Sequence, residues 1–366
     1  MAMSTAQTLR RADLAGFSGY KSARSDTLQA DIVLNANEFP WSNPADATGA
    51  CRRYPDPQPG ALLSAMAGLY GVAPEQILLG RGSDEGIELL LRTFCAPGRG
   101  TVLIAPPVFG MYAVCARLHG AQVVEVPLLD TRQGFKPDLD EMAALALRTG
   151  ATVLFLCTPG NPTGEAISLE DISRVARQLH QHCLVVVDEA YGEFCETGSS
   201  VSMLPAHDNI VVLKTLSKAY ALAGARVGAV IAHPTTIEAM RASQAPYPIP
   251  EPVVSLAMAA ISNAAVAETR TRVEQVKRLR DALSQKLAVM PGVRRVYPSQ
   301  ANFVLVRLVA AEQVLSALRA AGILVRDMRA MPGLGDAIRI TVGDESENAR
   351  VLEVMKESMP LQRELA

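Results

Sequence analysis

The sequence predicts an α/β protein: a large domain with a mainly parallel sheet covered by helices, and a smaller α+β domain. Three observations lead to this prediction. Short apolar runs alternate with amphipathic helical stretches between residues 75 and 235. Most of these runs are continuous in Val, Ile and Leu, which is typical of strands covered on both faces. After Pro250 the pattern changes to a long helical region followed by shorter units. Such alternation favours parallel βαβ units.

The large domain is expected to contain strands at residues 101–106, 123–127, 151–157, 184–188, 209–214 and 226–232. Helix start signals lie between them. Ser83 and Asp84 open the amphipathic stretch SDEGIELLLRTFC, and Ser168 with Asp171 three residues later resembles a capping box before DISRVARQLHQH. Each predicted strand is therefore followed by a turn or a helix that returns the chain to the same edge of the sheet.

The second domain begins with the helical region 252–290, which ends at Pro291 and Gly292. Strands are predicted after it at 293–298, 301–308, 323–328 and 337–343, with helices at 311–322 and from residue 345. The N-terminal residues show little regular patterning and are expected to pack on this second domain. We therefore expect three parts: an arm with part of the small domain at 1–48, the large domain at 49–250, and an interdomain helix with the small domain at 251–366.

Composition and charge argue against several classes of function. The chain has 366 residues, of which 49% are hydrophobic, and this is enough for a core in each of two domains. A formal net charge of −2 gives no general attraction to nucleic acid or to an anionic membrane. The six cysteines show no metal-binding spacing and are expected to be reduced. Without a signal-peptide core or a membrane-spanning apolar stretch, the sequence indicates a cytoplasmic protein with no bound metal.

Polar residues that could take part in catalysis or ligand binding lie at the ends of three predicted strands, where open α/β sheets bind ligands. Lys218 follows the run NIVVLK, and low dielectric there would lower its pKa, as a Schiff-base lysine requires. Asp188 ends LVVVD and needs a cationic or hydrogen-bonding partner. Asn161 lies in the turn T-P-G-N-P-T-G, and its bond to Pro162 is a candidate cis peptide. Each residue also has an ordinary interpretation: a surface lysine, a helix N-cap and a simple loop.

Other strand ends carry residues that suit a phosphate and a planar ring. Ser83 and Asp84 begin a helix after two glycines, where free N–H groups suit a phosphate dianion. The Ser217 hydroxyl and the Arg226 guanidinium are suitable partners for the same group. Phe109 follows the strand at 101–106 and can stack on a planar cofactor, although an aromatic residue at a strand end more commonly belongs to the core.

Together these residues supply what pyridoxal 5′-phosphate (PLP) needs: a lysine for its aldehyde, an aspartate for its ring nitrogen, donors for its phenolic oxygen, a phosphate cup and a stacking ring. The motifs that carry them run in the order G-R-G-S-D-E, P-P-V-F-G-M-Y, P-G-N-P-T-G, D-E-A-Y, T-L-S-K and A-L-A-G-A-R-V-G. In this order, and over nearly the whole chain, the sequence resembles the class I/II aminotransferases of PLP-dependent fold type I.

Within that superfamily the flanking segments most resemble the histidinol-phosphate aminotransferase family. The segments are Y-K-S-A-R (20–24), L-N-A-N-E (34–38), R-Y-P (53–55), G-S-D-E-G-I-E-L (82–89), V-R-D (325–327) and I-R-I-T-V-G (338–343). Two positions depart from the family pattern. Phe109 stands where tyrosine is often found, which keeps ring stacking and loses a hydroxyl. Gly19 stands where proline is common, which affects the path of the arm and the role of Tyr20.

The resemblance implies a role for each candidate residue. Lys218 forms the Schiff base, Asp188 pairs with the ring nitrogen, and Tyr191 contacts the phenolic oxygen together with Asn161. Phe109 stacks on the ring. The cofactor phosphate is held by Ser83, Asp84, Ser217, Arg226 and, in a homodimer, by the partner subunit's Tyr54. The residues implied to bind the substrate are Tyr20, Asn37, Arg326 and Arg339.

The implied reaction is transamination between L-histidinol phosphate and 2-oxoglutarate, which gives imidazole-acetol phosphate and L-glutamate in histidine biosynthesis. Three alternatives remain from the sequence: another class I/II aminotransferase acting on aromatic or general amino acids, a threonine-phosphate decarboxylase, and a non-enzymatic aminotransferase-like ligand sensor. The sensor would need a DNA-binding module before the domain, and residues 1–48 contain no basic recognition helix.

Overall fold

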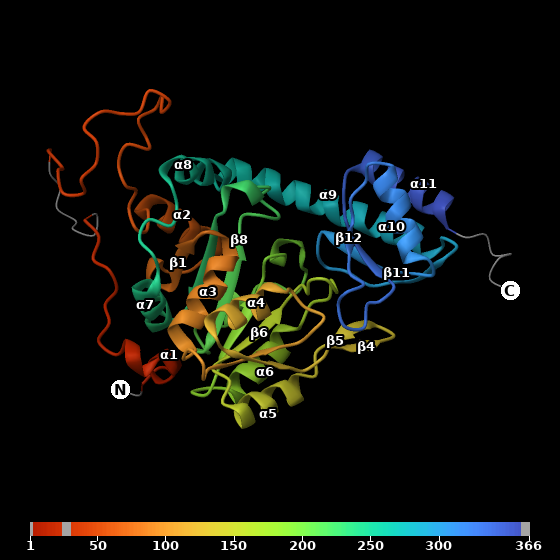
Figure 1. Ribbon diagram of the computed structural model, residues 1–366, viewed down its shortest axis with the longest axis horizontal. Coiled ribbons are helices and arrows are strands. Elements are labelled where there is room, and N and C mark those ends of the chain that lie inside the picture. Colours follow the sequence, from red (N-terminus) through yellow and green to blue (C-terminus); the bar gives the residue numbers. More distant parts are fainter. Residues whose placement is uncertain (1–2, 24–30, 360–366) are drawn as a thin grey trace.

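The computed structural model describes residues 3–23 and 31–359. Arg24, the last residue of the segment Y-K-S-A-R, lies outside this range. Figure 1 shows a large part around a central sheet and a smaller part at the far end of the long helix α9 (Asn263–Ala288). This agrees with the large and small domains predicted from the sequence.

The central sheet has seven strands in the order β1-β9-β8-β7-β6-β2-β3. β9 is antiparallel to both of its neighbours, and the other pairs of adjacent strands are parallel. All six predicted strands are present, and the four-residue strand β1 was missed. The bounds are β1 Ile77–Gly80, β2 Thr101–Ile104, β3 Gln122–Glu125, β6 Val153–Cys157, β7 Leu184–Asp188, β8 Ile210–Thr215 and β9 Gly228–Ala232.

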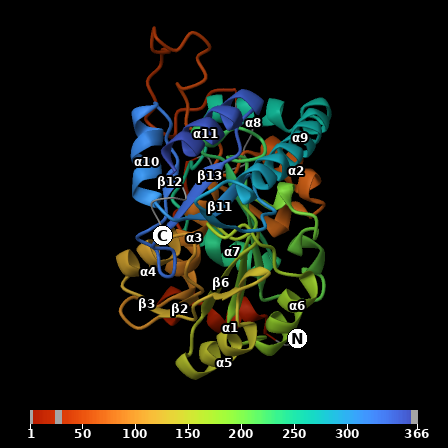
Figure 2. The same ribbon diagram turned by 90° about the vertical axis from the view of Figure 1, so that its right-hand side faces the viewer.

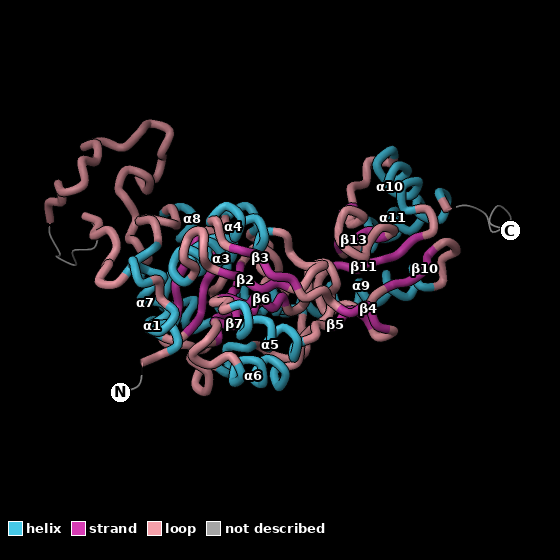
Figure 3. Tube along the Cα trace, turned by 60° about the horizontal axis from the view of Figure 1, so that its bottom comes forward, coloured by secondary structure: helices cyan, strands magenta, loops and turns pink. Residues whose placement is uncertain are grey.

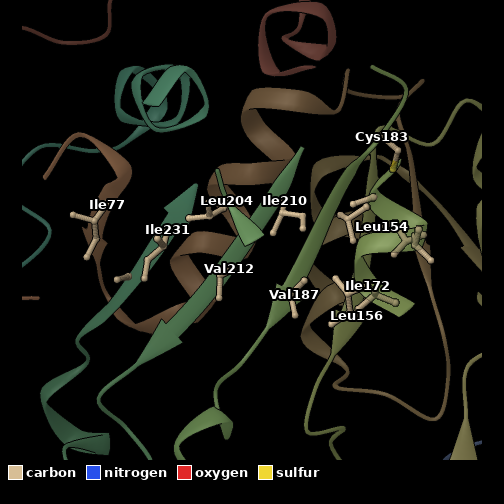
Figure 4. Packing of buried hydrophobic residues seen from close by; sticks show 14 of the residues in the cluster. Ile77, Leu154, Leu156, Ile172, Cys183, Val187, Leu204, Ile210, Val212 and Ile231 are labelled. Atoms are coloured by element: carbon tan, nitrogen blue, oxygen red, sulfur yellow. The ribbon is translucent and has the colours of Figure 1, made fainter. Parts of the chain in front are cut away.

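Continuous apolar strands arise here because helices cover both faces of the sheet. In β7, Val185 and Val187 belong to one hydrophobic core, whereas Leu184 and Val186 belong to the core on the opposite face. Figure 4 shows the first core, in which residues from several strands point toward the same side. A fully buried side chain of this size stabilises the fold by about 1.5–3 kcal/mol, so neither face of β7 tolerates a polar residue at little cost.

The helices divide between the two faces. The first core contains side chains from α2 (Gly60–Tyr70), α5 (Leu139–Thr149), α6 (Leu169–Gln178) and α8 (Glu251–Ala260). The second contains side chains from α1 (Thr5–Leu9), α3 (Gly82–Phe94), α4 (Met111–His119) and α7 (Pro234–Ser243). Ser168 is the N-cap of α6 and accepts a hydrogen bond from the Asp171 N–H, as predicted.

The small domain is an antiparallel sheet covered by helices. Its strands lie in the order β10-β11-β13-β12. The predicted helical region 252–290 divides into α8 and α9, which are bent by 67° at a break where Ser262 caps α9. Among the described residues, no single helix is both long and apolar enough to cross a membrane, and only this bent pair taken together meets the criterion. The remaining elements are β10 Val293–Val296, β11 Phe303–Leu308, α10 Ala311–Ala320, β12 Arg326–Asp327, β13 Ala337–Thr341 and α11 Glu345–Ser358.

The described N-terminal residues pack on the large domain, so the prediction that residues 1–48 join the small domain is wrong for their first part. The Thr5 hydroxyl and N–H donate to the Asp208 carboxylate at 2.7 and 2.8 Å. Ala6 is buried in the core beneath α3 and α7, and the Arg11 N–H donates to the Thr93 carbonyl at 3.1 Å. These contacts join residues far apart in the sequence, and no periodic pattern signals them.

After Gly16 the arm runs along α7, where a Cβ atom on Gly19 would lie 2.6 Å from the Ala242 carbonyl oxygen. It contains no helix or strand among its described residues up to 59. Figures 1 and 3 show its later part, from residue 31, as a loop that extends away from the large domain. Phe39 and Trp41 pack edge to face at 5.4 Å, yet they are 68% and 72% exposed. Exposed apolar surface of this kind is typical of regions that contact other molecules.

A two-stranded antiparallel hairpin of the large domain packs against the small domain. The sequence did not predict this hairpin. It consists of β4 (Leu129–Thr131) and β5 (Gly134–Lys136) and is separate from the central sheet. Figures 1 and 3 place it beside the small domain, and Figure 2 shows the two domains from the side.

Glu165, which follows the turn T-P-G-N-P-T-G, is pressed against this hairpin. A Cβ atom on Gly134 would lie 1.0 Å from the Glu165 Oε1, so only glycine fits there. Burial raises the pKa of Glu165 to about 7 and outweighs the nearby positive charges of Lys136 and Arg295. In the folded state the carboxyl therefore holds a proton at pH values where the unfolded chain, with its ordinary pKa of 4.5, has lost it. Stability should fall as the pH rises from the unfolded pKa toward 7.

Glu165→Gln should remove this pH dependence. We expect the variant to be more stable than the wild type at pH 8 by about 1 kcal/mol, since solvent screening reduces the effect at a half-buried carboxyl. Below pH 4.5 the two proteins should have the same stability, because both carry a neutral side chain there. Chemical denaturation at both pH values measures the difference, with the exposed α6 residue Glu170→Gln as control. Equal stability of wild type and variant at pH 8 would contradict the expectation.

Candidate active site

The carboxyl ends of β6, β7 and β8 open into one cavity. Nine residues predicted to bind the cofactor line it, although they are spread over more than a hundred positions of the chain. These are Ser83, Asp84, Phe109, Asn161, Asp188, Tyr191, Ser217, Lys218 and Arg226. Four further residues complete the lining: Cys157, Ala190, Thr215 and Ala223.

Lys218 lies in a tight turn after β8, and its side chain is accessible from the cavity. The preceding Leu216 is fully buried and anchors the turn, since its N–H donates to the Val227 carbonyl and its carbonyl accepts from the Leu222 N–H, both at 3.0 Å. The Lys218 Nζ lies 5.6 Å from the centre of the Tyr191 ring. Partial burial, followed by the positive charge of Arg339, lowers the pKa of Lys218. A larger share of this amine is therefore neutral near pH 7 than for an ordinary lysine.

Asp188 ends β7 and is only 3% exposed. Its Oδ2 accepts a hydrogen bond from the Tyr112 hydroxyl at 2.6 Å, and its Oδ1 accepts from the Ala190 N–H at 3.0 Å. Burial raises the pKa of Asp188, and these two hydrogen bonds oppose that rise. Tyr112 is itself buried and stacks on Phe155 at 4.5 Å. We did not single out Tyr112 from the sequence, although it ends the motif P-P-V-F-G-M-Y.

The next residue, Glu189, points to the opposite face of the sheet. Its Oε2 pairs with Lys214 Nζ at 2.8 Å and accepts from the Ser199 hydroxyl at 2.6 Å, and its Oε1 accepts from the Ser200 N–H at 2.6 Å. Both Glu189 and Lys214 are buried. Two adjacent carboxylates therefore serve different faces: Asp188 faces the cavity, and Glu189 closes an ion pair beneath it.

Two residues from the large domain meet an arginine of the small domain at the cavity. The Asn161 amide donates to the Tyr191 hydroxyl at 3.5 Å, and its Oδ1 accepts from Arg339 Nη1. The bond between Asn161 and the next residue is cis, as the sequence suggested. Arg339 lies 5.0 Å above the Phe303 ring, and its Nε is buried without a hydrogen-bond partner. Burial lowers the pKa of this guanidinium and raises that of the Tyr191 hydroxyl.

The cup predicted for a phosphate is built around Arg226. This residue has a left-handed backbone (φ +57°), and its Nη2 pairs with Asp84 Oδ2 at 3.0 Å while its Nη1 donates to Ser217 Oγ at 3.3 Å. The Ser217 Oγ also accepts from the Thr215 hydroxyl at 2.9 Å, a contact that we did not predict. A Cβ atom at Gly82 would lie 2.6 Å from Arg226 Nη2, and Gly82 has φ +78°, so only glycine allows this approach.

Helix α3 begins at this cup, and its first N–H groups have no partner within the helix. They suit an anion. The Asp84 carboxylate carries the opposite charge to Arg226 and would repel a phosphate, so the backbone N–H of Asp84 rather than its side chain suits the predicted role.

Tyr20, Asn37 and Tyr54 were also predicted, and they do not line this cavity in the single chain. Tyr20 is 73% exposed and lines a separate cavity against α7, together with Arg10. Asn37 is exposed and has φ +54°. Tyr54 is 50% exposed and stacks on Tyr247 at 4.6 Å. All three are in or next to the exposed arm.

Arg326 does not line the cavity around Lys218. It is exposed on β12, directly opposite Arg339 on β13. Its positive charge lowers the pKa of Arg339. Guanidinium groups on paired residues of neighbouring strands suit a phosphate or a carboxylate, so the predicted role of both arginines is consistent with their places in the sheet.

A family model, curated relatives and solved structures all show similarity to aminotransferases. The family model "Aminotransferase class I and II" matches residues 20–355. The curated histidinol-phosphate aminotransferase of Xanthomonas euvesicatoria pv. vesicatoria (strain 85-10) is 52% identical over 97% of this chain and 98% of its own. The crystal structure of histidinol-phosphate aminotransferase from Sinorhizobium meliloti in complex with pyridoxal-5′-phosphate has a TM-score of 0.78 and 26% identity, covering 89% of this chain and 88% of that one.

A structure of L-threonine-O-3-phosphate decarboxylase from Porphyromonas gingivalis has a TM-score of 0.72 at 21% identity, covering 86% of this chain and 92% of that one. This likeness concerns the fold alone. The family model and the relative at 52% identity both extend over nearly the whole sequence. The chain therefore belongs to the class I and II aminotransferases, PLP-dependent enzymes of fold type I, and among them to the histidinol-phosphate aminotransferase family.

Proposed function

We propose that this enzyme transfers the amino group of L-histidinol phosphate to 2-oxoglutarate, giving imidazole-acetol phosphate and L-glutamate as a step of histidine biosynthesis. The observation that carries the proposal is that Lys218 and Asp188 line one cavity of the large domain, while Arg339 from the small domain binds Asn161 at its wall. Full-length relatives at 52% identity that are named for this activity support the same substrate.

The donors in the cavity fit PLP. The strongest indication is Asp188, a buried carboxylate whose hydrogen bonds come from two neutral donors, the Tyr112 hydroxyl and the Ala190 N–H. A buried carboxylate without a cation is costly, and the protonated ring nitrogen of PLP would supply that cation. Lys218 has an amine of lowered pKa for the aldehyde, and Phe109 presents a ring at the cavity wall.

The phosphate of the cofactor would be held by the Arg226 guanidinium, the Ser217 hydroxyl and the N–H groups at the start of α3. The Asn161 amide and the Tyr191 hydroxyl, which already contact each other, would hold the phenolic oxygen. When bound, PLP would accept the electrons that remain on the amine-bearing carbon of the substrate after that carbon loses its proton.

The chain's own residues then carry the proton transfer. Lys218 would take the proton from the amine-bearing carbon as a general base and then, as a general acid, donate it to the carbon that carries the aldehyde in free PLP. Its lowered pKa favours the role of base near neutral pH. Asp188 stabilises a positive charge in front of it and thereby keeps the ring nitrogen protonated. Tyr191 holds the Lys218 amine over its ring.

Arg339 and Arg326 would bind the anionic group of each substrate. The same site must accept the phosphate of histidinol phosphate and a carboxylate of 2-oxoglutarate or glutamate, and the N–H fork of a guanidinium suits both. We propose that Tyr20 and Asn37 complete this site from the arm.

We also propose a homodimer in the cytoplasm. A second copy of the chain would cover the exposed aromatic side chains of the arm, and the partner subunit's Tyr54 would reach the cofactor phosphate. The exposure of Phe39 and Trp41 supports the dimer, and six free cysteines are typical of a reducing compartment.

A substrate screen with purified, PLP-loaded protein tests the proposed function. Histidinol phosphate with 2-oxoglutarate should give glutamate faster than phenylalanine, tyrosine or threonine phosphate as amino donor. Release of carbon dioxide from threonine phosphate without amino transfer would instead make the protein a decarboxylase. Binding of donors without any turnover would support the sensor alternative.

Arg339→Ala should raise the KM for histidinol phosphate and for 2-oxoglutarate by roughly 10- to 100-fold, because a charge-assisted bond to an anion contributes about 1.5–3 kcal/mol. Steady-state kinetics with each substrate varied in turn measures the effect. Arg294→Ala is the matched control, since Arg294 belongs to the same domain and pairs with Asp336 on the surface. An unchanged KM for both substrates would remove Arg339 from the site.

A further inference from the structure

We infer that Asp130, on the β4–β5 hairpin of the large domain, is a positioning residue that holds the substrate arginines of the small domain in register with Lys218. The inference rests on the proposed role of Arg339 and Arg326 in binding the substrate. Asp130 itself lies outside the cavity that contains Lys218, so it would act only through the residues that it holds.

One carboxylate of the large domain accepts three bonds from the small domain. The Asp130 Oδ1 pairs with Arg295 Nη1 at 2.7 Å. The Oδ2 pairs with Arg307 Nη1 at 3.1 Å and accepts from the Tyr297 hydroxyl at 2.7 Å. Arg295 also donates to the Thr131 carbonyl on the same hairpin. A single exposed ion pair contributes little to stability, whereas several donors on one carboxylate form the kind of network that fixes a geometry.

The charges explain why this position needs an acid. Arg295 and Arg307 are opposite each other across β10 and β11, so two guanidinium groups lie side by side. Asp130 neutralises both from the other domain. Asp336 also binds Arg307, at 2.7 Å, but it belongs to the small domain and spans no interface.

An apolar contact accompanies the ion pairs. Phe135 of the hairpin stacks on the Tyr297 ring at 5.0 Å with an angle of 28° between the rings. Both side chains are buried in a small cluster whose other members come from the small domain: Leu305, Met328, Leu334 and Ala337. The hairpin is therefore inserted into the small domain, and it does not merely touch it.

Tyr297, which donates to Asp130, is linked by strand pairing across the small sheet to the two arginines that would bind the substrate. The Tyr297 N–H donates to the Leu305 carbonyl at 3.0 Å. Leu305 on β11 is directly opposite Arg339 on β13, and Arg339 is directly opposite Arg326 on β12. A shift of Tyr297 relative to the large domain would thus move both arginines relative to Lys218.

The small domain also contacts the large domain beside the turn that carries Asn161. The Gln300 N–H donates to the Gly164 carbonyl at 2.6 Å, in the turn that also carries Asn161. A Cβ atom at Gly164 would lie 2.6 Å from the Ser299 Oγ. The Gln300 side chain also accepts a hydrogen bond from the Glu196 N–H at 3.0 Å. These contacts hold the small domain near Asn161, and the β4–β5 hairpin holds it at a separate place.

Asp130→Ala should therefore raise the KM for glutamate and for histidinol phosphate by about 5- to 20-fold and change kcat by less than about threefold, since a small displacement of binding groups has a large effect on productive binding. Cofactor affinity and the pH titration of the cofactor absorbance should stay as in the wild type, because the groups that hold the cofactor belong to the large domain. Tyr297→Phe should also raise the KM. The double variant should be no worse than Asp130→Ala alone, because the Tyr297 hydroxyl bond is one of the three that Asp130→Ala already removes.

Asp336→Asn is the matched control, because it removes another carboxylate partner of Arg307 within the small domain; its KM values should stay within about twofold of wild type. The inference is overturned if Asp130→Ala keeps wild-type KM values, if Asp336→Asn raises them equally, or if cofactor affinity falls in parallel with KM. Glutamate separates this inference from the proposed function. A wild-type enzyme that reacts with glutamate and not with histidinol phosphate would defeat the proposed substrate, and the KM for glutamate would still decide the role of Asp130.

Discussion

Lys218→Ala should lower turnover by at least about 10⁴-fold, because it removes both the covalent attachment and the general base at the amine-bearing carbon. The folded protein should remain intact, since the Lys218 side chain is accessible and Leu216 rather than Lys218 anchors the turn. The visible absorbance of the lysine-linked cofactor should disappear. Borohydride reduction followed by peptide mapping should find the cofactor on Lys218 in the wild type and nowhere on this peptide in the variant.

The exposed Lys356 on α11 offers a matched control, and Lys356→Ala should keep wild-type kinetics and absorbance. A Lys218→Ala protein that transaminates at near wild-type rate would show that the central assignment is wrong, whichever substrate is used.

Asp188→Asn should lower kcat by about 10²- to 10⁴-fold, because an uncompensated buried charge costs roughly 3–5 kcal/mol when one partner of a buried ion pair is removed. Asparagine keeps the size of the side chain and can still accept from the Tyr112 hydroxyl. It carries no charge, so the ring nitrogen of the cofactor would lose its proton. We expect weaker cofactor binding together with the loss of rate, measured by equilibrium titration with PLP and by single-turnover kinetics.

Asp140→Asn serves as control, since Asp140 pairs with Arg174 on the surface and is 77% exposed. A kcat for Asp188→Asn within tenfold of wild type would contradict the proposed pairing with the ring nitrogen.

The sequence predicted the large domain well because its signals are local. Continuous apolar runs such as residues 184–188 are fully buried strands between two helical layers, as the pattern required. It missed β1 because four residues are too short a run beside a glycine-rich turn, and it missed the β4–β5 hairpin because the strands L-D-T and G-F-K alternate too briefly.

The residues of the site also divide into those that a local sequence signal predicts and those that have no such signal. Residues predicted to touch the cofactor lie at strand ends, where the topology itself brings them together. Tyr112 and Thr215 escaped prediction because they act on other side chains, Asp188 and Ser217, and not on the ligand. The arm residues Tyr20, Asn37 and Tyr54 were chosen by resemblance, and one chain alone does not bring them to the cavity.

The alternation of Asp188 and Glu189 has a consequence for how this enzyme can change over generations. Since successive side chains of a strand point to opposite faces, inserting or deleting one residue within β7 would turn the residues on one side of the change to the wrong faces. If the earlier valines keep their places, a deletion would bring Glu189 to the cavity, and an insertion would turn Asp188 toward Lys214. If the carboxylates keep theirs, the valines before the change would leave their cores. Point substitutions in β7 can be selected one at a time, whereas a change in its length would remove stability and chemistry in a single event. We therefore expect length variation among descendants of this sequence to concentrate in the arm and in the surface loops.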